Sequence, residues 1–141
     1  LLTDRWGSPA IVSRGVLHNV THLKGYIAKQ KDDTIGLITY RIHNNDCEII
    51  SLDSLTQKQG VGTALVEEVK REAKSQGSTR VWTITTNDNI EAIRFWQRRG
   101  FTFVALYRNA LEASRKLKPE IPLIGNHGIP LRDEIELEIL L

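Results

Sequence analysis

The feature that most constrains this chain is a glycine-containing turn between a predicted strand and a predicted helix. The segment from Gln57 to Gly62 reads Gln-Lys-Gln-Gly-Val-Gly and leads into a charged helical stretch. The first turn of a helix has backbone N–H groups without intrahelical partners and carries a partial positive charge. Alternate glycines leave these donors accessible, so the turn suits a phosphate or pyrophosphate. A tight strand-to-helix connection explains it equally well.

The stretch after the turn predicts an amphipathic helix over Gly60–Gln76. Its Glu67 and Arg71 are four residues apart on the polar side, a spacing that gives modest local support. The predicted buried face contains Val61, Leu65, Val69 and Ala73, with Ala64 and Val66 beside them.

Two motifs in this order resemble the signatures of a known family. Gln57-x-x-Gly60-x-Gly62 is similar to the (Arg/Gln)-x-x-Gly-x-(Gly/Ala) signature of the GNAT superfamily of acetyl-CoA-dependent N-acetyltransferases. A strand predicted over Arg80–Thr86 comes next. Then Asn89, Ala92 and Phe95, followed by Gly100-Phe101, fall in register with the family's Asn-x-x-Ala-x-x-Phe-Tyr signature and the Gly-Phe that closes its helix. The chain therefore resembles a GNAT acetyltransferase.

The strand pattern around the motifs agrees with this resemblance. Three β-branched segments, Tyr26–Gln30, Ile35–Ile42 and Cys47–Ser54, are separated by Asp- and Asn-containing turns, which is typical of a meander. With the later strand–helix–strand–helix–strand order, this predicts an α/β (α+β) three-layer sandwich: a GNAT-like mixed sheet with helices on both faces. We expect one N-acetyltransferase domain over residues 1–141, matched best over 26–107, with the family's first strand missing before Leu1.

Beyond the second motif, local signals predict the remaining elements. Asp88, with Glu91 three residues later, has the spacing of a capping box for the second helix. In the C-terminal part, residues 109–141, a short helix is predicted over Ala110–Lys118. The strictly alternating Glu134–Ile139 predicts a seventh strand with one solvent-exposed face. An alternative is that its glutamates line a pocket for an amine.

The resemblance implies acetyl-CoA as co-substrate. No metal is expected, because His18 and His22 are four residues apart but no third ligand is spaced to join them. In the family, the strand before the glycine turn splays from its neighbour at a bulge, and the pantetheine arm pairs with its exposed backbone. Here that backbone belongs to Ile50 and the residues up to Leu55. The positions that the resemblance assigns to coenzyme A binding are Leu52, Asp53, Ser54, Gln57, Lys58, Gln59, Gly60, Val61, Gly62, Thr63, Asn89, Phe95 and Trp96.

Acyl transfer from a thioester to an amine needs a neutral amine, a stabilised oxyanion and a proton for the thiolate. Glu48 is the candidate base, because alternation places it on the same face as Ile50 and Leu52. Asp46 and Asp53 are rivals, and an exposed structural glutamate is the plain alternative for Glu48.

The residue that protonates the thiolate is a second question. Trp96 stands where the family usually has a tyrosine acid, and an indole N–H does not release its proton near neutral pH. Tyr107 or water then becomes the proton donor, or the thiolate leaves without help.

Composition excludes several other functions. A formal net charge of +2 without a basic stripe argues against nucleic-acid binding. No apolar run is long enough for a membrane helix. The single cysteine, Cys47, rules out an internal disulfide and suits a reducing compartment, so we expect a cytoplasmic protein. The absence of methionine suggests either that the natural N-terminus lies outside this sequence or that methionines have been lost from it.

The predicted function is N-acetylation of a primary amine by direct transfer from acetyl-CoA. The acceptor stays open between a small amine, an aminoglycoside, an amino acid and a protein N-terminus, and a homodimer is compatible with the resemblance. The alternative is a non-catalytic module with the same fold that binds acyl-CoA as a sensor or interaction partner.

Overall fold

The structure, a computed structural model, describes residues 2–3, 10–13, 16–19, 23–54 and 60–141. Its contacts divide the chain into two compact units. The first is built mainly on Asn19–Val81, and the second on Trp82–Ile139 together with Ala10–His18. Each unit is described by itself.

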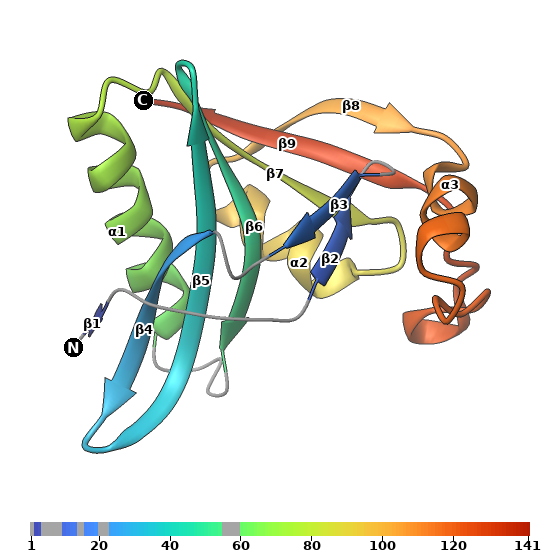
Figure 1. Ribbon diagram of the computed structural model, residues 1–141, viewed down its shortest axis with the longest axis horizontal. Helices are drawn as coiled ribbons and strands as arrows, with labels where there is room; N and C mark the ends of the chain where they lie inside the picture. Colours follow the sequence, from blue (N-terminus) through green and yellow to red (C-terminus); the bar gives the residue numbers. More distant parts are fainter. Residues whose placement is uncertain (1, 4–9, 14–15, 20–22, 55–59) are drawn as a thin grey trace. The chain divides into compact units, whose positions relative to one another are not determined.

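The first unit contains an antiparallel meander. Strands β4 (Lys24–Gln30), β5 (Asp33–His43) and β6 (Asp46–Ser54) follow one another, and the short β1 (Leu2–Thr3) pairs with β4 (Figure 1). The three predicted strands are confirmed. Each begins one or two residues earlier than predicted, and β5 also ends one residue later. The turns between them place Lys31 and Asn44 at positive φ, where short hairpin connections need it.

Helix α1 (Val61–Ser75) packs against this meander. The helix approaches β5 closely at Gly36, where an added Cβ would lie 2.5 Å from Cγ1 of Val61, so only glycine fits. The buried face holds Val61, Leu65, Val66, Val69 and Ala73, as predicted. Ala64 is exposed, so its assignment to that face was wrong.

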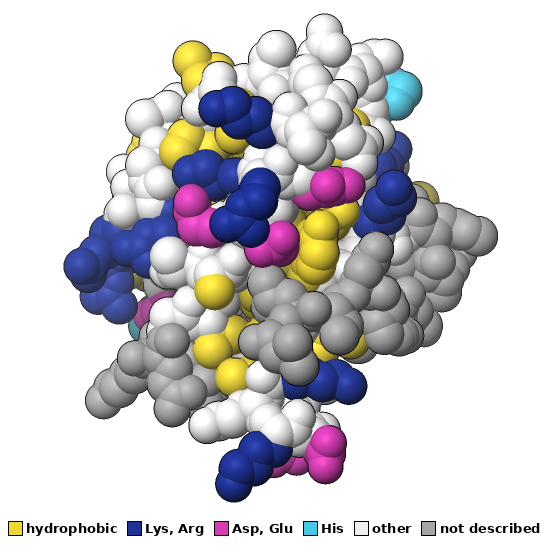
Figure 2. Space-filling view, turned by 90° about the vertical axis from the view of Figure 1, so that its left-hand side faces the viewer, with side chains coloured by type: hydrophobic (Ala, Val, Ile, Leu, Met, Phe, Trp, Pro, Cys, Tyr) yellow, Lys and Arg dark blue, Asp and Glu magenta, His cyan; other side chains and the backbone are white. Residues whose placement is uncertain are grey.

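The outer side of α1 is a solvated, mixed-charge surface. Figure 2, seen from the side on which α1 lies in Figure 1, shows Lys and Arg interspersed with Asp and Glu. The ion pairs of α1 are Glu67–Lys70 at 3.2 Å and Glu68–Arg71 at 2.5 Å. The expected Glu67–Arg71 pair is therefore replaced by pairs three residues apart.

The second unit contains β8 (Thr102–Tyr107) and most of β7 (Arg80–Thr86) and β9 (Glu134–Leu140), and the three strands lie in the spatial order β7, β9, β8. The first two residues of β7 and the last residue of β9 belong to the first unit. The helices are α2 (Ile90–Arg98) and α3 (Ala110–Leu117), with a short 3-10 turn, η3 (Asn126–Gly128). Strands β2 (Ala10–Ser13) and β3 (Val16–Asn19) form a separate hairpin, which the sequence did not predict because this segment has no clear period.

The cap of α2 differs from the prediction. Asn89, not Asp88, is the N-cap, and its side-chain oxygen accepts from the N–H of Ala92 at 3.1 Å. The Asp88 carboxylate is buried and accepts instead from the Thr86 hydroxyl and the Asn126 N–H. Asp88 therefore ties the β7–α2 turn to the segment around η3.

Candidate active site

A β-bulge interrupts β6 where the family resemblance expects one. The β5–β6 register pairs Thr39 with Ser51 and Tyr40 with Ile49, which leaves Ile50 as the extra residue. A bulge of this kind exposes backbone groups and shifts the alternation of side chains by one position. The backbone that the resemblance assigns to the pantetheine arm therefore begins at an irregular point of the strand.

The bulge changes the predicted position of Glu48. Glu48 pairs with Arg41 on β5, whereas Leu52 pairs with Ile38. Directly opposed residues of an antiparallel pair share one face, and Arg41 and Ile38 lie on opposite faces. The expectation that Glu48 shares a face with Leu52 was wrong, because Ile50 breaks the period of two. Glu48 lies instead on the face of Ser51.

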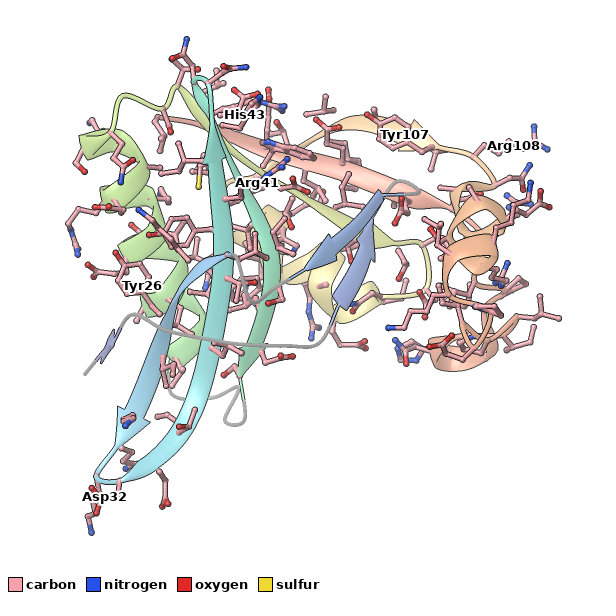
Figure 3. All side chains as sticks on the ribbon, viewed as in Figure 1. Tyr26, Asp32, Arg41, His43, Tyr107 and Arg108 are labelled. Atoms are coloured by element: carbon pink, nitrogen blue, oxygen red, sulfur yellow. The ribbon has the colours of Figure 1, made fainter. Side chains whose placement is uncertain are left out.

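Glu48 is a buried carboxylate with a cationic neighbour. It is 5% exposed, and its Oε1 lies 3.7 Å from Nη2 of Arg41, whose side chain is 51% exposed. Figure 3 labels Arg41 on β5. The expectation of an exposed structural glutamate is therefore excluded. The two rivals are more open: Asp46 pairs with Arg80 at 3.3 Å, and Asp53 is exposed.

Cys47, beside Glu48, is not available as an acyl carrier. It is fully buried, and burial raises the pKa of its thiol to about 12, with Glu48 adding to the rise. The thiolate is the nucleophilic form of cysteine. Since this is the only cysteine of the chain, acyl transfer through an enzyme thiol is disfavoured.

The second half of the glycine turn forms the start of α1. Gly60 is the N-cap with φ of 70°, a left-handed conformation that favours glycine, and among the described residues no side chain caps the helix. Val61 and Gly62 are buried in the first turn, and Thr63 is half-buried. The predicted residues Gln57, Lys58 and Gln59 lie outside the described residues. The described part thus offers a helix N-terminus without a side-chain cap.

The second motif forms an aromatic cluster in the second unit. Trp96 is 4% exposed and contacts Phe95 edge-on, with ring centroids 5.1 Å apart, and Phe101 at 4.9 Å. Arg99 lies over the Phe95 ring, 5.4 Å from its centroid. Trp96 therefore packs inside the second unit. The side-chain oxygen of Asn89 caps α2.

Tyr107 is hydrogen-bonded to Glu136, a residue that the sequence pattern predicted to face the solvent. Its hydroxyl donates to Oε1 of Glu136 at 2.7 Å. Glu136 is 5% exposed and Glu134 is 2% exposed. The prediction of one solvent-exposed face on the last strand was therefore wrong for these glutamates. The alternation was read correctly, but the charged side faces the interior.

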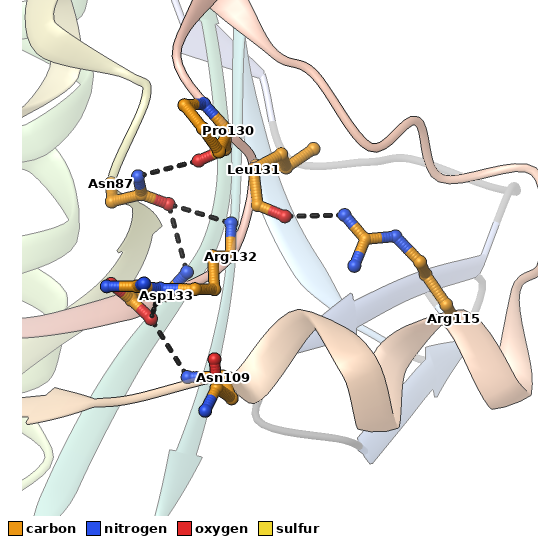
Figure 4. Close-up of polar contacts among 7 residues, drawn as sticks. All are labelled: Asn87, Asn109, Arg115, Pro130, Leu131, Arg132 and Asp133. Carbon is orange, nitrogen blue, oxygen red and sulfur yellow. Dashed lines mark hydrogen bonds and ion pairs between the residues drawn. The ribbon is translucent and has the colours of Figure 1, made fainter.

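A polar network that the sequence analysis missed fixes the segment before β9. Figure 4 shows Asn87 accepting from the N–H groups of Arg132 and Asp133 at 3.0 and 2.9 Å and donating to Pro130 O at 2.9 Å. Asp133 also accepts from the N–H of Asn109 at 2.8 Å. No local sequence signal marks such bonds, because the partners are more than twenty residues apart.

Arg115 of α3 holds the same segment from the other side. Its guanidinium donates to the carbonyls of Ile121, Pro122 and Leu131 (the Leu131 bond is drawn in Figure 4). The loop from 119 to 132 is therefore tied by side chains at both ends, in addition to its own antiparallel bridge between Ile124 and Pro130.

Within the described ranges, no group of three or more His, Cys, Asp and Glu side chains is arranged to hold a metal ion. Among the helices that the structure describes, none combines the length and the apolar character needed to cross a membrane.

Comparisons with known proteins agree with this geometry. The sequence profile that matches residues 5–101 is that of the Acetyltransferase (GNAT) family. The chain is 45% identical over 140 residues to the uncharacterized protein YdhI of Bacillus subtilis (strain 168), covering 96% of this chain and 88% of that protein.

Two solved structures have a similar fold. An acetyltransferase of Bacillus subtilis, in complex with CoA, is 24% identical with a TM-score of 0.71, and the likeness covers 84% of this chain and 77% of that one. A GNAT family acetyltransferase of Elizabethkingia anophelis, with acetyl-CoA bound, is 23% identical with a TM-score of 0.75, covering 86% and 78%. The fold is thus that of the GNAT acetyltransferases.

The chain belongs to the GNAT acetyltransferase family. The family resemblance of the two motifs is confirmed, as is the predicted α/β fold with a mixed sheet.

Proposed function

We propose that this protein transfers the acetyl group of acetyl-CoA directly to a primary amine of a small molecule or peptide. In this proposal residues 1–141 act as one N-acetyltransferase domain. The observation that carries it is a bulge at Ile50 followed along the chain by Gly60, at positive φ, and by an α1 N-terminus for which the described residues provide no side-chain cap. Two solved relatives in fold hold CoA or acetyl-CoA, which supports the same ligand here.

The proposed coenzyme A site uses backbone more than side chains. The segment Leu52–Ser54 would pair with the pantetheine arm, and Gln57–Thr63 would receive the pyrophosphate at the positive end of α1. Asn89, Phe95 and Trp96 complete the proposed site. For Trp96 the proposed contribution is to support the position of Phe95, because its ring packs between Phe95 and Phe101.

Direct transfer is supported by the state of Cys47, which is buried and protonated. The amine must then attack the thioester itself and lose a proton. Glu48 and Tyr107 are the proposed groups for proton transfer. Arg41 stabilises the charged form of Glu48, which keeps it ready to accept a hydrogen bond from an amine.

A second candidate is a non-catalytic acyl-CoA sensor. The observation that favours it is the buried indole of Trp96 at the position where the family usually has a tyrosine acid. Release of CoA from acetyl-CoA across a panel of amines separates the two functions, because a sensor binds acetyl-CoA and releases none.

The binding site is tested by calorimetry with CoA. Gly60→Asp places a negative charge at the proposed phosphate site and should weaken CoA binding at least about tenfold, as expected for loss of a charge-assisted contact. Gly60→Asn is the matched control, because asparagine has the same shape without charge and tolerates positive φ. An added Cβ at Gly60 meets nothing within 4 Å, so both variants have room. Equal affinity in the two variants would contradict the proposed site.

A further inference from the structure

We propose that β8 is a docking surface for a second copy of this chain, which pairs with it edge to edge as an antiparallel strand. β8 is the last strand in the order of its sheet, with β9 on one side and no described strand on the other (Figure 1). The outer edge of such a strand presents backbone N–H and C=O groups that can pair with another chain. The proposal uses residues of the second unit alone and does not depend on the proposed function.

The side chains of β8 form an exposed apolar surface. Phe103 is 56% exposed, Val104 is 47% exposed and Leu106 is 63% exposed, all within a strand of six residues. Leu137, which pairs with Phe103 from β9, is by contrast fully buried. Single exposed apolar side chains are normal on a protein surface, whereas several gathered on one element mark an interaction site. The outermost strand of the second unit therefore has the composition of a covered one.

The composition of β8 fits a second copy of the same strand. Its sequence, Thr-Phe-Val-Ala-Leu-Tyr, contains no charged residue, no proline and no glycine. Edge strands that avoid pairing usually carry Lys, Pro or an inward-pointing charge. In a two-fold dimer the same surface of each copy meets the other. Two uncharged strands can meet in this way without placing like charges against each other, which a strand rich in one charge could not do.

A bulge in β8 brings its two largest exposed side chains to one face. The β8–β9 register pairs Phe103 with Leu137 and Leu106 with Ile135, and it passes over Val104. Ile135 and Leu137 are two positions apart on β9 and therefore share a face. Directly opposed residues of an antiparallel pair also share a face. Phe103 and Leu106 thus lie on the same face of the sheet, although they are three positions apart in the sequence.

This arrangement selects one register for a two-fold pair. When Phe103 of one copy opposes Leu106 of the other, Thr102 opposes Tyr107 on the other face, and each pair occurs twice. A shift by one residue would set Phe103 against a residue of the opposite face, and the apolar contact would be lost. Pairing in the selected register occupies the β8 edge of both copies, so the assembly closes as a dimer and does not grow into a longer sheet.

The size of the surface sets the strength of the dimer. A stable interface buries about 800 Å² on each partner, and one pair of six-residue strands buries less. We therefore expect a dimer that dissociates on dilution. Sedimentation velocity of the wild-type protein over a wide concentration range should show the mean mass rising from one chain toward two and no further.

Charged substitutions on β8 test the surface and its register. Phe103→Lys combined with Leu106→Lys opposes like charges across the two-fold axis, so this double variant should stay monomeric at every concentration. Phe103→Lys combined with Leu106→Glu opposes unlike charges in the selected register and should associate at least about tenfold more tightly than the first double variant. Leu123→Lys, at an exposed leucine outside β8, is the matched control and should dimerise as the wild-type protein does. Circular dichroism verifies that all variants are folded, since every substituted side chain is exposed.

Hydrogen exchange tests whether the backbone of β8 takes part. Amides of β8 that are not bonded to β9 should exchange more slowly in concentrated than in dilute wild-type protein, while the amides of α1 keep the same protection at both concentrations. A wild-type chain that is monomeric throughout would overturn the proposal, as would a dimer that survives the double lysine substitution. Equal association of the two double variants, or β8 protection that does not change with concentration, would overturn it as well.

Discussion

The interiors of the two units are filled with side chains of different chemistry. The first unit is packed with apolar side chains: Ile27, Ala28, Leu37, Ile38, Tyr40, Cys47, Ile49, Val61, Leu65, Val66, Val69, Ala73 and Val81 are all buried. The second unit buries few apolar residues and many polar ones. Among its described residues, the buried polar set is Thr83, Thr85, Asp88, Ser114, Asp133, Glu134 and Glu136.

The two kinds of interior are stabilised differently. Apolar burial is non-directional and roughly proportional to area. A buried polar group instead needs a partner at the right distance and angle, and losing that partner leaves a desolvated group. The second unit therefore depends on particular contacts, such as those of Asp88, Asn87 and Asp133. We infer that the second unit has less apolar packing and a more fixed arrangement of polar side chains than the first.

The largest expected effect tests the apolar interior. Leu65→Ala removes a side chain with no exposed area and should lower the free energy of unfolding by about 2–5 kcal/mol. Leu117→Ala, at a leucine that is 51% exposed, is the matched control and should change it by less than about 0.5 kcal/mol. Urea unfolding at neutral pH measures both. Similar losses at the two sites would contradict the assignment of the core.

A smaller effect tests the polar interior. An added Cβ at Gly125 would lie 2.1 Å from Oδ2 of Asp88, the oxygen that accepts from the Asn126 N–H. Gly125→Ala should therefore displace Asp88 and destabilise the protein by about 1–3 kcal/mol.

The control for this prediction is a double-mutant cycle. Asp88→Ala removes the clash, so Gly125→Ala should cost less in that background than in the wild-type protein. Urea unfolding of the four proteins gives the coupling. If the two losses of stability simply add, contact with Asp88 is not the reason why glycine is required at position 125.

The smallest expected effect is pH dependence in the polar interior. The Arg132 side chain, by its hydrogen bonds, and the Asn109 N–H hold the pKa of Asp133 below its usual value, against the effect of burial. A carboxyl with a lowered folded-state pKa stabilises the protein above its unfolded-state pKa, near 3.8, and this contribution is lost as pH falls through the folded-state value.

The urea midpoint should therefore fall less between pH 7 and pH 3 in Asp133→Asn than in the wild-type protein. Asp32→Asn, at an exposed aspartate in the β4–β5 turn, is the matched control and should follow the wild-type curve. The apolar variant Leu65→Ala should also keep the wild-type pH dependence, although it is less stable throughout. A wild-type slope in Asp133→Asn would show that this ion pair contributes nothing to acid sensitivity.

The elements that could be predicted from the sequence are those with strong local signals. The meander, α1, β7 and α3 were predicted correctly, because hydrophobic periodicity, turn residues and helix caps depend on a few neighbouring residues. The β2–β3 hairpin was missed because its segment has no clear period. The N-cap of α2 was misassigned by one residue, because Asp88 and Asn89 are both good capping residues and tertiary contacts engage Asp88.

The amino-acid sequence by itself determined the family, through two spaced motifs, and the order of the main strands and helices. Only the tertiary structure decided which face each candidate site residue occupies. One extra residue, Ile50, moves Glu48 to the face opposite Leu52. The alternation of β9 defines two faces but does not tell which one is covered, and in the structure Glu134 and Glu136 are buried. The physical reason is that alternation is a local property, whereas bulges, burial and long-range hydrogen bonds depend on partners that are distant in the chain.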